Sequence, residues 1–285
     1  MENDSDFNQY MISFKYQFKS YLRTKRFLGL FIFTLIISVG ITALILHDEY
    51  SMLKAGTPLF YFYNYLENFS TDLVVIIGAF FGGDIISTDT GTNAAYYTLV
   101  QPVRRSVLFM GRYTAALISS FVIIFVYFLV GIISSFYLYG TVTSVIFESL
   151  GIVVLFLAAA ISFASLFSGI FKGQSSGIIV SVLLLFIGFP IIDIFVGTID
   201  GIDPLFSLDF AGEIMYLIFE NPYPAAKVVG SGGFGGPGAA AARVSSFVGY
   251  TFSPTVMQGI GVLIAYMAIC GVIAILLYTR RQIEG

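Results

Sequence analysis

The side chains that could do chemistry in this chain gather around one polar stretch. Asp84 and Asp89 lie in the Gly- and Thr-rich sequence 82–92, and arginines follow at positions 104, 105 and 112. Acids near a membrane surface would suit proton transfer to or from a lipid. However, the acid-and-arginine pattern of lipid-headgroup transferases and the zinc motif His-Glu-x-x-His are both absent. We therefore expect no catalytic residue and no metal ligand here.

The sequence contains no convincing nucleotide-binding motif either. The phosphate-binding pattern Gly-x4-Gly-Lys-Ser/Thr does not occur, so any energy from ATP must come from another chain. Gly230-x-Gly232-x-x-Gly235 formally matches a dinucleotide fingerprint, but it lies in a glycine run without the required strand and helix. We expect no cofactor in this chain, no enzyme activity of its own and no nucleic acid partner.

The amino-acid composition indicates the class of protein. Of the 285 residues, 57% are hydrophobic and only 11% are charged. A soluble domain carries about 25% charged residues, so the sequence indicates an integral membrane protein. The single Cys270 excludes an internal disulfide framework, and the single His47 has no metal-binding neighbours.

Six continuous apolar runs approach the roughly 20 residues that a spanning helix needs. They predict an all-α membrane protein of a single domain, residues 1–285, rather than a β-barrel, whose strands would alternate. The predicted spans are Phe27–Leu46, Asn68–Ile86, Thr114–Tyr139, Val145–Leu166, Ser176–Val196 and Val256–Tyr278.

Lysine and arginine predict the orientation, because they favour the cytoplasmic side. With both termini inside, 11 of the 14 basic residues are cytoplasmic and 3 are outside. The outer three are Lys54, Lys227 and Arg243. We therefore expect a multi-pass protein of the cell membrane whose termini and polar stretch face the cytoplasm.

Three regions lie outside the predicted spans. Aromatic residues recur at helical spacing within residues 1–26, which predicts an amphipathic helix in the membrane interface. On the outer side, the sequence predicts a loop at 47–67 and a larger loop at 197–254. Within the larger loop, the apolar stretch 214–219 is too short to span and predicts a re-entrant or surface-lying helix.

Ionisable groups near the outer membrane edge are weaker candidates for a translocation path. These are Glu148 and Asp193, of which Asp193 follows Pro190, a residue that loosens a helix. The larger outer loop also carries Asp209 and Glu213 among its acids, which suits either a cationic substrate or an ordinary solvated loop. Gly78 and Gly82 form a small-x-x-x-small pair, which suits helix contact within the chain or between two copies.

The polar stretch resembles the signature of permease subunits of type-2 ATP-binding cassette (ABC) exporters. That signature places an acidic residue, Gly-Thr, a short helix and Pro-Val/Ile-x-Arg after the second span. Asp89, Gly91, Thr92 and the sequence Pro102-Val103-Arg104-Arg105 occupy the corresponding places. The six predicted spans, the amphipathic start and the large loop before the last span are also similar to that family.

The resemblance implies a function for residues 87–112. In the family this segment holds the coupling helix, which docks on a cytoplasmic ATPase that binds ATP and magnesium. A second permease copy, identical or related, completes such a transporter. The implied coupling residues are Asp89, Gly91, Thr92, Tyr97, Pro102, Arg104 and Arg105.

The residues themselves agree with a docking segment. Thr92 can cap a helix that Pro102 ends, and the apolar Tyr97 suits a groove on a partner. Arg104 and Arg105 can pair with acids of a partner or with lipid phosphates. Two alternatives stay open: a membrane anchor or scaffold that transports nothing, and an intramembrane enzyme that modifies lipids.

Overall fold

The computed structural model describes most of the chain. The described residues are 6–48, 56–87, 104–171, 173–199, 202–220, 223, 228–229, 250–251 and 253–280. They form a bundle of helices, and the only sheet among them is one antiparallel pair of two-residue strands, β1 (Val228–Val229) with β2 (Tyr250–Thr251). The predicted all-α class is therefore confirmed for the described part of the chain.

Five helical segments are long and apolar enough to cross a membrane, which is the pattern of a membrane protein. They match five of the six predicted spans. These segments are Lys25–His47, Arg105–Tyr139, Val145–Ile170, Ser175–Val196 and Val256–Arg280. The first is part of α2 (Lys25–Asp48), and the second, third and fifth are α8, α9 and α14. The fourth runs through α10 (Gln174–Leu183), η1 (Leu184–Gly188) and α11 (Phe189–Asp193) into η2 (Ile194–Ile199).

The sixth predicted span, Asn68–Ile86, is a shorter helix in the structure. Helix α5 (Ser70–Gly82) has 13 residues, which corresponds to a length of about 20 Å. The preceding residues, predicted as an outer loop, form α4 (Pro58–Glu67), because Thr57 caps it and Pro58 suits its first turn. The crossing of a membrane by this segment stays a prediction.

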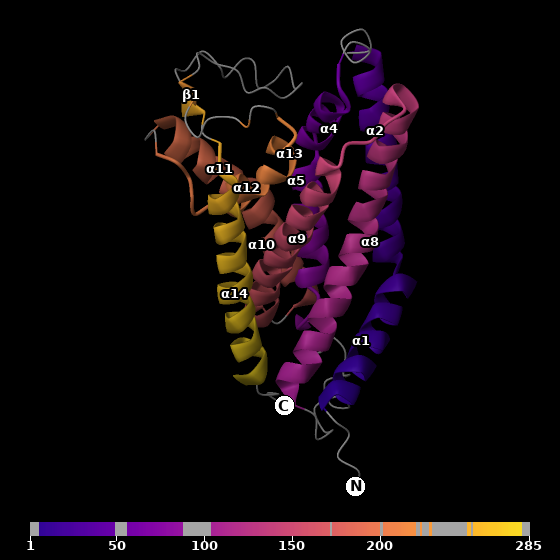
Figure 1. Cartoon of the computed structure of the whole chain (residues 1–285). Helices are drawn as coiled ribbons and strands as arrows, with labels where there is room; N and C mark the ends of the chain where they lie inside the picture. The colour runs from indigo at the N-terminus through magenta and orange to yellow at the C-terminus, as the bar shows by residue number, and fades with distance from the viewer. Residues whose placement is uncertain are drawn as a thin grey trace.

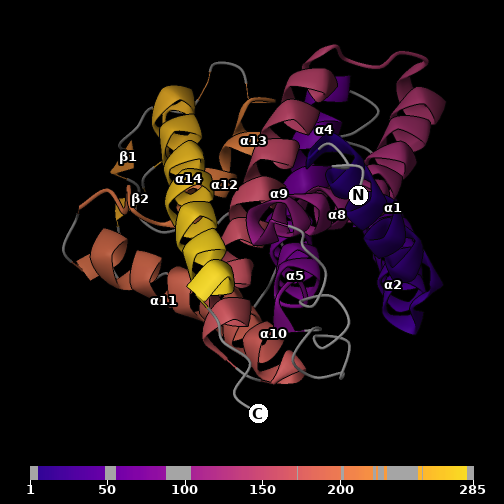
Figure 2. The same ribbon diagram turned by 90° about the horizontal axis from the view of Figure 1, so that it is seen from below.

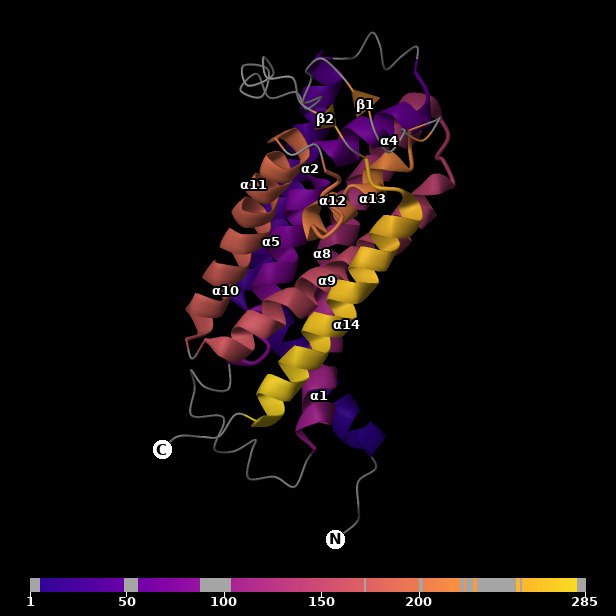
Figure 3. The ribbon, with the colours of Figure 1, turned by 90° about the vertical axis from the view of Figure 1, so that its left-hand side faces the viewer.

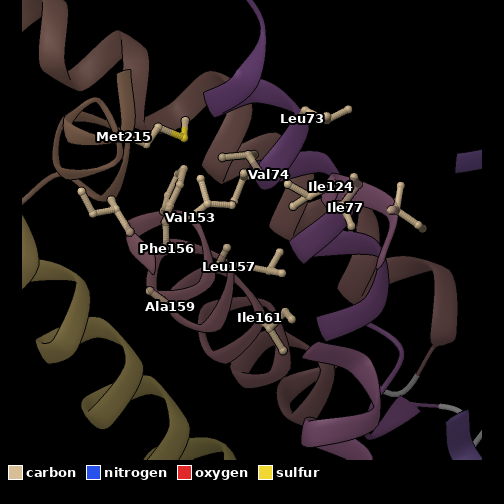
Figure 4. Close-up of a cluster of buried hydrophobic side chains, with 14 of the residues drawn as sticks. Leu73, Val74, Ile77, Ile124, Val153, Phe156, Leu157, Ala159, Ile161 and Met215 are labelled. Carbon is tan, nitrogen blue, oxygen red and sulfur yellow. The ribbon is translucent and has the colours of Figure 1, made fainter. Parts of the chain in front are cut away.

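Helix α5 lies inside the bundle and packs on α9, as Figures 2 and 4 show. A Cβ added at Gly78 would lie 2.8 Å from Cβ of Ala160, and one at Gly82 would lie 2.7 Å from Cβ of Ala164. The two glycines therefore allow close helix contact within the chain. This is one of the two predictions from the sequence, the other being contact between two copies. Leu73, Val74 and Ile77 of α5 also belong to the buried core.

Two tyrosines join α4 to α8 on the other side of the core. The hydroxyl of Tyr65 donates to the carbonyl of Tyr127 at 2.8 Å, and the hydroxyl of Tyr127 donates to the carbonyl of Tyr65 at 2.7 Å. Their rings stack with centroids 4.6 Å apart. Each buried hydroxyl thus satisfies a carbonyl on the opposite helix, which fixes α4 although it is short.

Helix α1 (Asp6–Arg23) and the end of α14 lie at the same end of the bundle, the lower end in Figure 1. Helix α8 begins at Arg105 rather than at the predicted Thr114, so its first turns reach this end and pack against α1. The hydroxyl of Tyr10 donates to Thr114 Oγ1 at 2.9 Å. Phe7, Ile12 and Tyr16 remain exposed on α1, and the position of this helix in a membrane interface stays a prediction.

Helices α12 (Leu208–Gly212) and α13 (Ile214–Leu217) lie near the upper end, between α14 and α9, as Figure 3 shows. We call residues 207–217 the wedge. Its apolar side chains are buried against the bundle, and a re-entrant or surface-lying position of this part of the loop in a membrane stays a prediction. The contact is close, since a Cβ added at Gly212 would lie 2.7 Å from the ring of Phe156.

Replacement of Gly82 by alanine should destabilise the fold. The new Cβ would lie 2.6 Å from the carbonyl oxygen of Ile161, and overpacking of this kind costs about 1–3 kcal/mol. Gly29→Ala on α2 is the control, because nothing lies within 4 Å of its added Cβ. Thermal unfolding in mild detergent should show a lower Tm for Gly82→Ala alone. Equal Tm values for the two variants would contradict this packing.

Candidate functional site

The described residues on either side of the polar stretch, Ser87 and Arg104, lie at the lower end of the bundle. Asp89, Gly91, Thr92, Tyr97 and Pro102 lie outside the described residues, which stop at Ser87 and resume at Arg104. The predicted coupling helix is therefore untested. The residues at both ends of the segment are described, however, and they show how it is attached to the helices.

The first attachment is a serine of α9. Ser168 is fully buried, and its hydroxyl oxygen accepts the N–H of Ile86 at 3.1 Å and the N–H of Ser87 at 3.0 Å. The chain has already left the α5 helix at this point, so these two N–H groups have lost the regular helical partner. Ser168 supplies the missing acceptor and ties the start of the segment to α9.

The second attachment is Arg112 of α8, which is 8% exposed. Its guanidinium donates to the carbonyl of Ile85 at 3.3 Å and lies 6.0 Å from the centroid of the Tyr278 ring. One side chain of α8 therefore contacts the end of α5 and the last turns of α14. The contact also gives a buried arginine a carbonyl and an aromatic face in place of water.

Ion pairs and one further hydrogen bond complete this end. Arg26 of α2 lies 3.5 Å from Asp84, and Arg104 lies 2.9 Å from Asp6 of α1. The guanidinium of Arg105 donates to the carbonyl of Thr279 on α14 at 3.1 Å. We call the set of Arg26, Asp84, Arg104, Arg105, Arg112 and Ser168 the collar. It connects the two ends of segment 88–103 to α1, α2, α8, α9 and α14.

Of the predicted coupling residues, the structure thus places Arg104 and Arg105 together at the start of α8. The sequence analysis did not identify Ser168, and it treated Arg112 only as a later basic position. Nothing in the sequence around Ser168 distinguishes it from other small helical residues. Its function depends on the close approach of α9 to the end of α5, which only the packing reveals.

Glu148 and Asp193, the weaker candidates for a translocation path, both lie at the upper end. Their surroundings differ. Glu148 is exposed in the first turn of α9, where the helix dipole favours an acid, so an ordinary surface position accounts for it. Asp193 ends α11, and the hydroxyl of Ser207 donates to its Oδ2 at 2.6 Å. Its Oδ1 is buried and has no hydrogen-bond partner among the described residues.

Two acids of the wedge, Asp209 and Glu213, lie close to Asp193. Burial, followed by the charges of Asp193 and Asp72, raises the pKa of Asp209 to about 7. Burial, followed by the charges of Asp209 and Asp193, raises the pKa of Glu213 well above its usual value. These two acids are therefore not the ordinary solvated loop groups that their sequence setting suggested.

Metal binding finds no support at this end. Within the described ranges, no group of three or more His, Cys, Asp or Glu side chains has the arrangement of a metal site. Cys270 is buried as a free thiol in α14. Burial raises the pKa of Asp209 and Glu213, so these two carboxyl groups can bind protons.

Comparison with protein-family models and with curated proteins gives no match for this chain. The arguments about function therefore rest on its own residues and on the resemblance of the polar stretch.

Replacement of Ser168 by alanine should release the start of the segment. Two buried N–H groups would lose their acceptor, at about 1–3 kcal/mol for each unsatisfied group. Hydrogen exchange at Ile86 and Ser87 should accelerate by about tenfold or more. Mass spectrometry of peptides that cover residues 84–87 measures this.

Ser165→Ala is the matched control. Ser165 is equally buried on the same helix, but its hydroxyl donates to the carbonyl of Ser162 in its own helix. Exchange at residues 84–87 should stay unchanged in this variant. An equal acceleration in both variants would mean that Ser168 acts only through general helix stability.

Proposed function

We propose that this chain is the transmembrane permease subunit of an ABC transporter. A separate ATPase subunit hydrolyses ATP with magnesium and docks on the Asp89–Arg105 segment, and the permease moves a substrate across the cell membrane. Export is the direction that the resemblance favours. A second permease copy, identical or related, completes the transporter.

The observation that carries this proposal is the collar. A polar stretch that served only as a turn between two helices would need partners for its freed backbone groups, but it would not need ion pairs to α1 and α2 or a hydrogen bond to α14. Here five helices contact its two ends, through hydrogen bonds of Ser168, Arg112 and Arg105 and through two ion pairs. Such an arrangement suits a segment whose displacement must move the bundle as a whole.

The mechanism follows from these contacts. ATP binding would bring two ATPase subunits together and shift the segment docked on each. The collar passes that shift to α9 through Ser168 and to α14 through Arg112 and Arg105. Rigid displacement of packed helices then alternates access to a path at the interface of the two permeases.

Co-purification tests the proposal directly. The native complex, extracted in mild detergent, should contain a protein with the phosphate-binding loop and ATPase activity that this chain lacks. Mass spectrometry identifies it, and vanadate-sensitive ATP hydrolysis by the purified complex confirms its activity. Reproducible absence of any ATPase from the intact complex would contradict the proposal.

Charge reversal at Arg104 tests the docking surface. Arg104 is the more exposed partner of its ion pair, with 75% of the side chain accessible, so it can also meet an acid of the ATPase. Arg104→Glu should lower ATP hydrolysis by the complex and the amount of bound ATPase. Circular dichroism should show an unchanged helix content.

The double variant Asp6→Arg with Arg104→Glu is the control. It restores the ion pair within the chain but presents the opposite charge at position 104. If Arg104 contacts the ATPase, the double variant stays defective. Full recovery would show that Arg104 acts only through Asp6, and the docking function of Arg104 would be wrong.

A further inference from the structure

The wedge at the upper end is a small apolar element inserted between long helices. Leu208, Ile214 and Met215 are fully buried, and Gly259 of α14 makes close contact with Ile214. Beyond the wedge, Phe219 is 2% exposed and stacks on Phe62 of α4 with ring centroids 5.5 Å apart. The wedge therefore covers the upper end of the core.

Three polar contacts hold the wedge, one from each of three helices. The hydroxyl of Ser207 donates to Asp193 on α11 at 2.6 Å. The hydroxyl of Ser149 on α9 donates to the carbonyl of Met215 at 2.7 Å. The hydroxyl of Tyr266 on α14 donates to the carbonyl of Phe206 beside the wedge at 2.7 Å.

The acids of the wedge work against these contacts when they ionise. Asp209 lies close enough to Asp193 of α11 and Asp72 of α5 to interact with their charges, and Glu213 interacts likewise with Asp209, Asp193 and Glu67 of α4. All of these charges are carboxylates. The other titratable groups around Glu213 are Tyr63, Tyr216 and Tyr223, of which Tyr216 shares a hydrogen bond with it. Neither wedge acid forms an ion pair within the described part of the chain.

The geometry points to a proton-operated latch: the wedge closes the upper end of the bundle while Asp209 and Glu213 hold protons, and it loosens when they release them. The ligand of this site is the proton. A wedge that loosens would uncover the core between α9, α11 and α14. The interpretation of the latch as an outer gate of a transport path rests on the proposed function. Its response to pH does not depend on that function.

The direction of the pH effect follows from the pKa of Asp209. It is about 7 in the closed wedge and close to the ordinary 3.8 once the group reaches water. The closed wedge therefore binds the additional proton between these two values. Its stability is complete below about pH 4 and falls as the pH rises towards 7. Because its pKa is also raised, Glu213 acts in the same direction.

A tryptophan reporter measures the opening, since the chain contains no tryptophan of its own. Phe219→Trp places the only indole beside the wedge, and acrylamide is a neutral quencher. Between about pH 4.5 and pH 7.5, the opening equilibrium should increase by up to about tenfold per pH unit, with stronger quenching as the result. Phe109→Trp, at the lower end of α8, should show no such change.

Two sets of variants separate the latch from general loosening. The double variant Asp209→Asn with Glu213→Gln replaces both titrating groups by neutral amides. Quenching should therefore stay low and independent of pH. Ser149→Ala breaks a contact that does not titrate, so it should increase quenching by a similar factor at every pH. Glu148→Gln, at an exposed acid of the same end, should retain the full pH dependence.

Hydrogen exchange of residues 207–217 in the unmodified chain gives a second measurement, corrected for the intrinsic effect of pH. A wedge whose quenching and exchange do not change with pH, or a double variant with the original pH dependence, would overturn the latch. The purified chain suffices for these experiments. Their failure would leave the ATPase partner untouched, and absence of an ATPase would leave the latch untouched.

Discussion

The fold depends on one constraint, the burial of a helix that is too short to cross a membrane alone. Helix α5 extends over about 20 Å, whereas the hydrocarbon layer is about 30 Å thick. Backbone that leaves a helix within a membrane is tolerated only where protein surrounds it. The small faces of Gly78 and Gly82 let α9 approach closely enough to provide that protein environment.

Both ends of α5 show the consequence. At its upper end, Ser70 and Asn68 donate to carbonyls of α4, and the Tyr65–Tyr127 pair joins α4 to α8. At its lower end, the released N–H groups reach Ser168 and the released carbonyl of Ile85 reaches Arg112. The collar is thus first a solution to a hydrogen-bonding problem. The same contacts make the end of α5 a rigid point of attachment for the polar segment.

The sequence predicts the long helices well because a continuous apolar run has one stable form in lipid. Five predicted spans agree with helices of the structure within a few residues, except that α8 starts earlier, at Arg105. The early start is not visible in the sequence, because the charged Arg112 interrupts the apolar run that would mark a span. Its partners, Ile85 and Tyr278, come from distant parts of the chain and leave no local signal.

The polar contacts are harder to predict from sequence. Arg104 and Arg105 are recognisable from their position after Pro102, but their partners Asp6 and Thr279 lie near opposite ends of the chain. Asp209 and Glu213 resemble solvated loop acids because the wedge that buries them is too short to register as a helix. In both places chain segments far apart in sequence meet at the end of the bundle, and only packing reveals that meeting.

The two ends of the bundle therefore differ in their electrostatics. In the described part of the lower end, arginines pair with Asp6 and Asp84 or donate to carbonyls. In the described part of the upper end, Asp209 and Glu213 interact with other carboxylates, and protonation relieves that repulsion. A lower end held by ion pairs and hydrogen bonds suits the transmission of force from a docked partner. An upper end with titratable charges suits an element that must open and close, because a change of protonation moves its equilibrium without breaking the core.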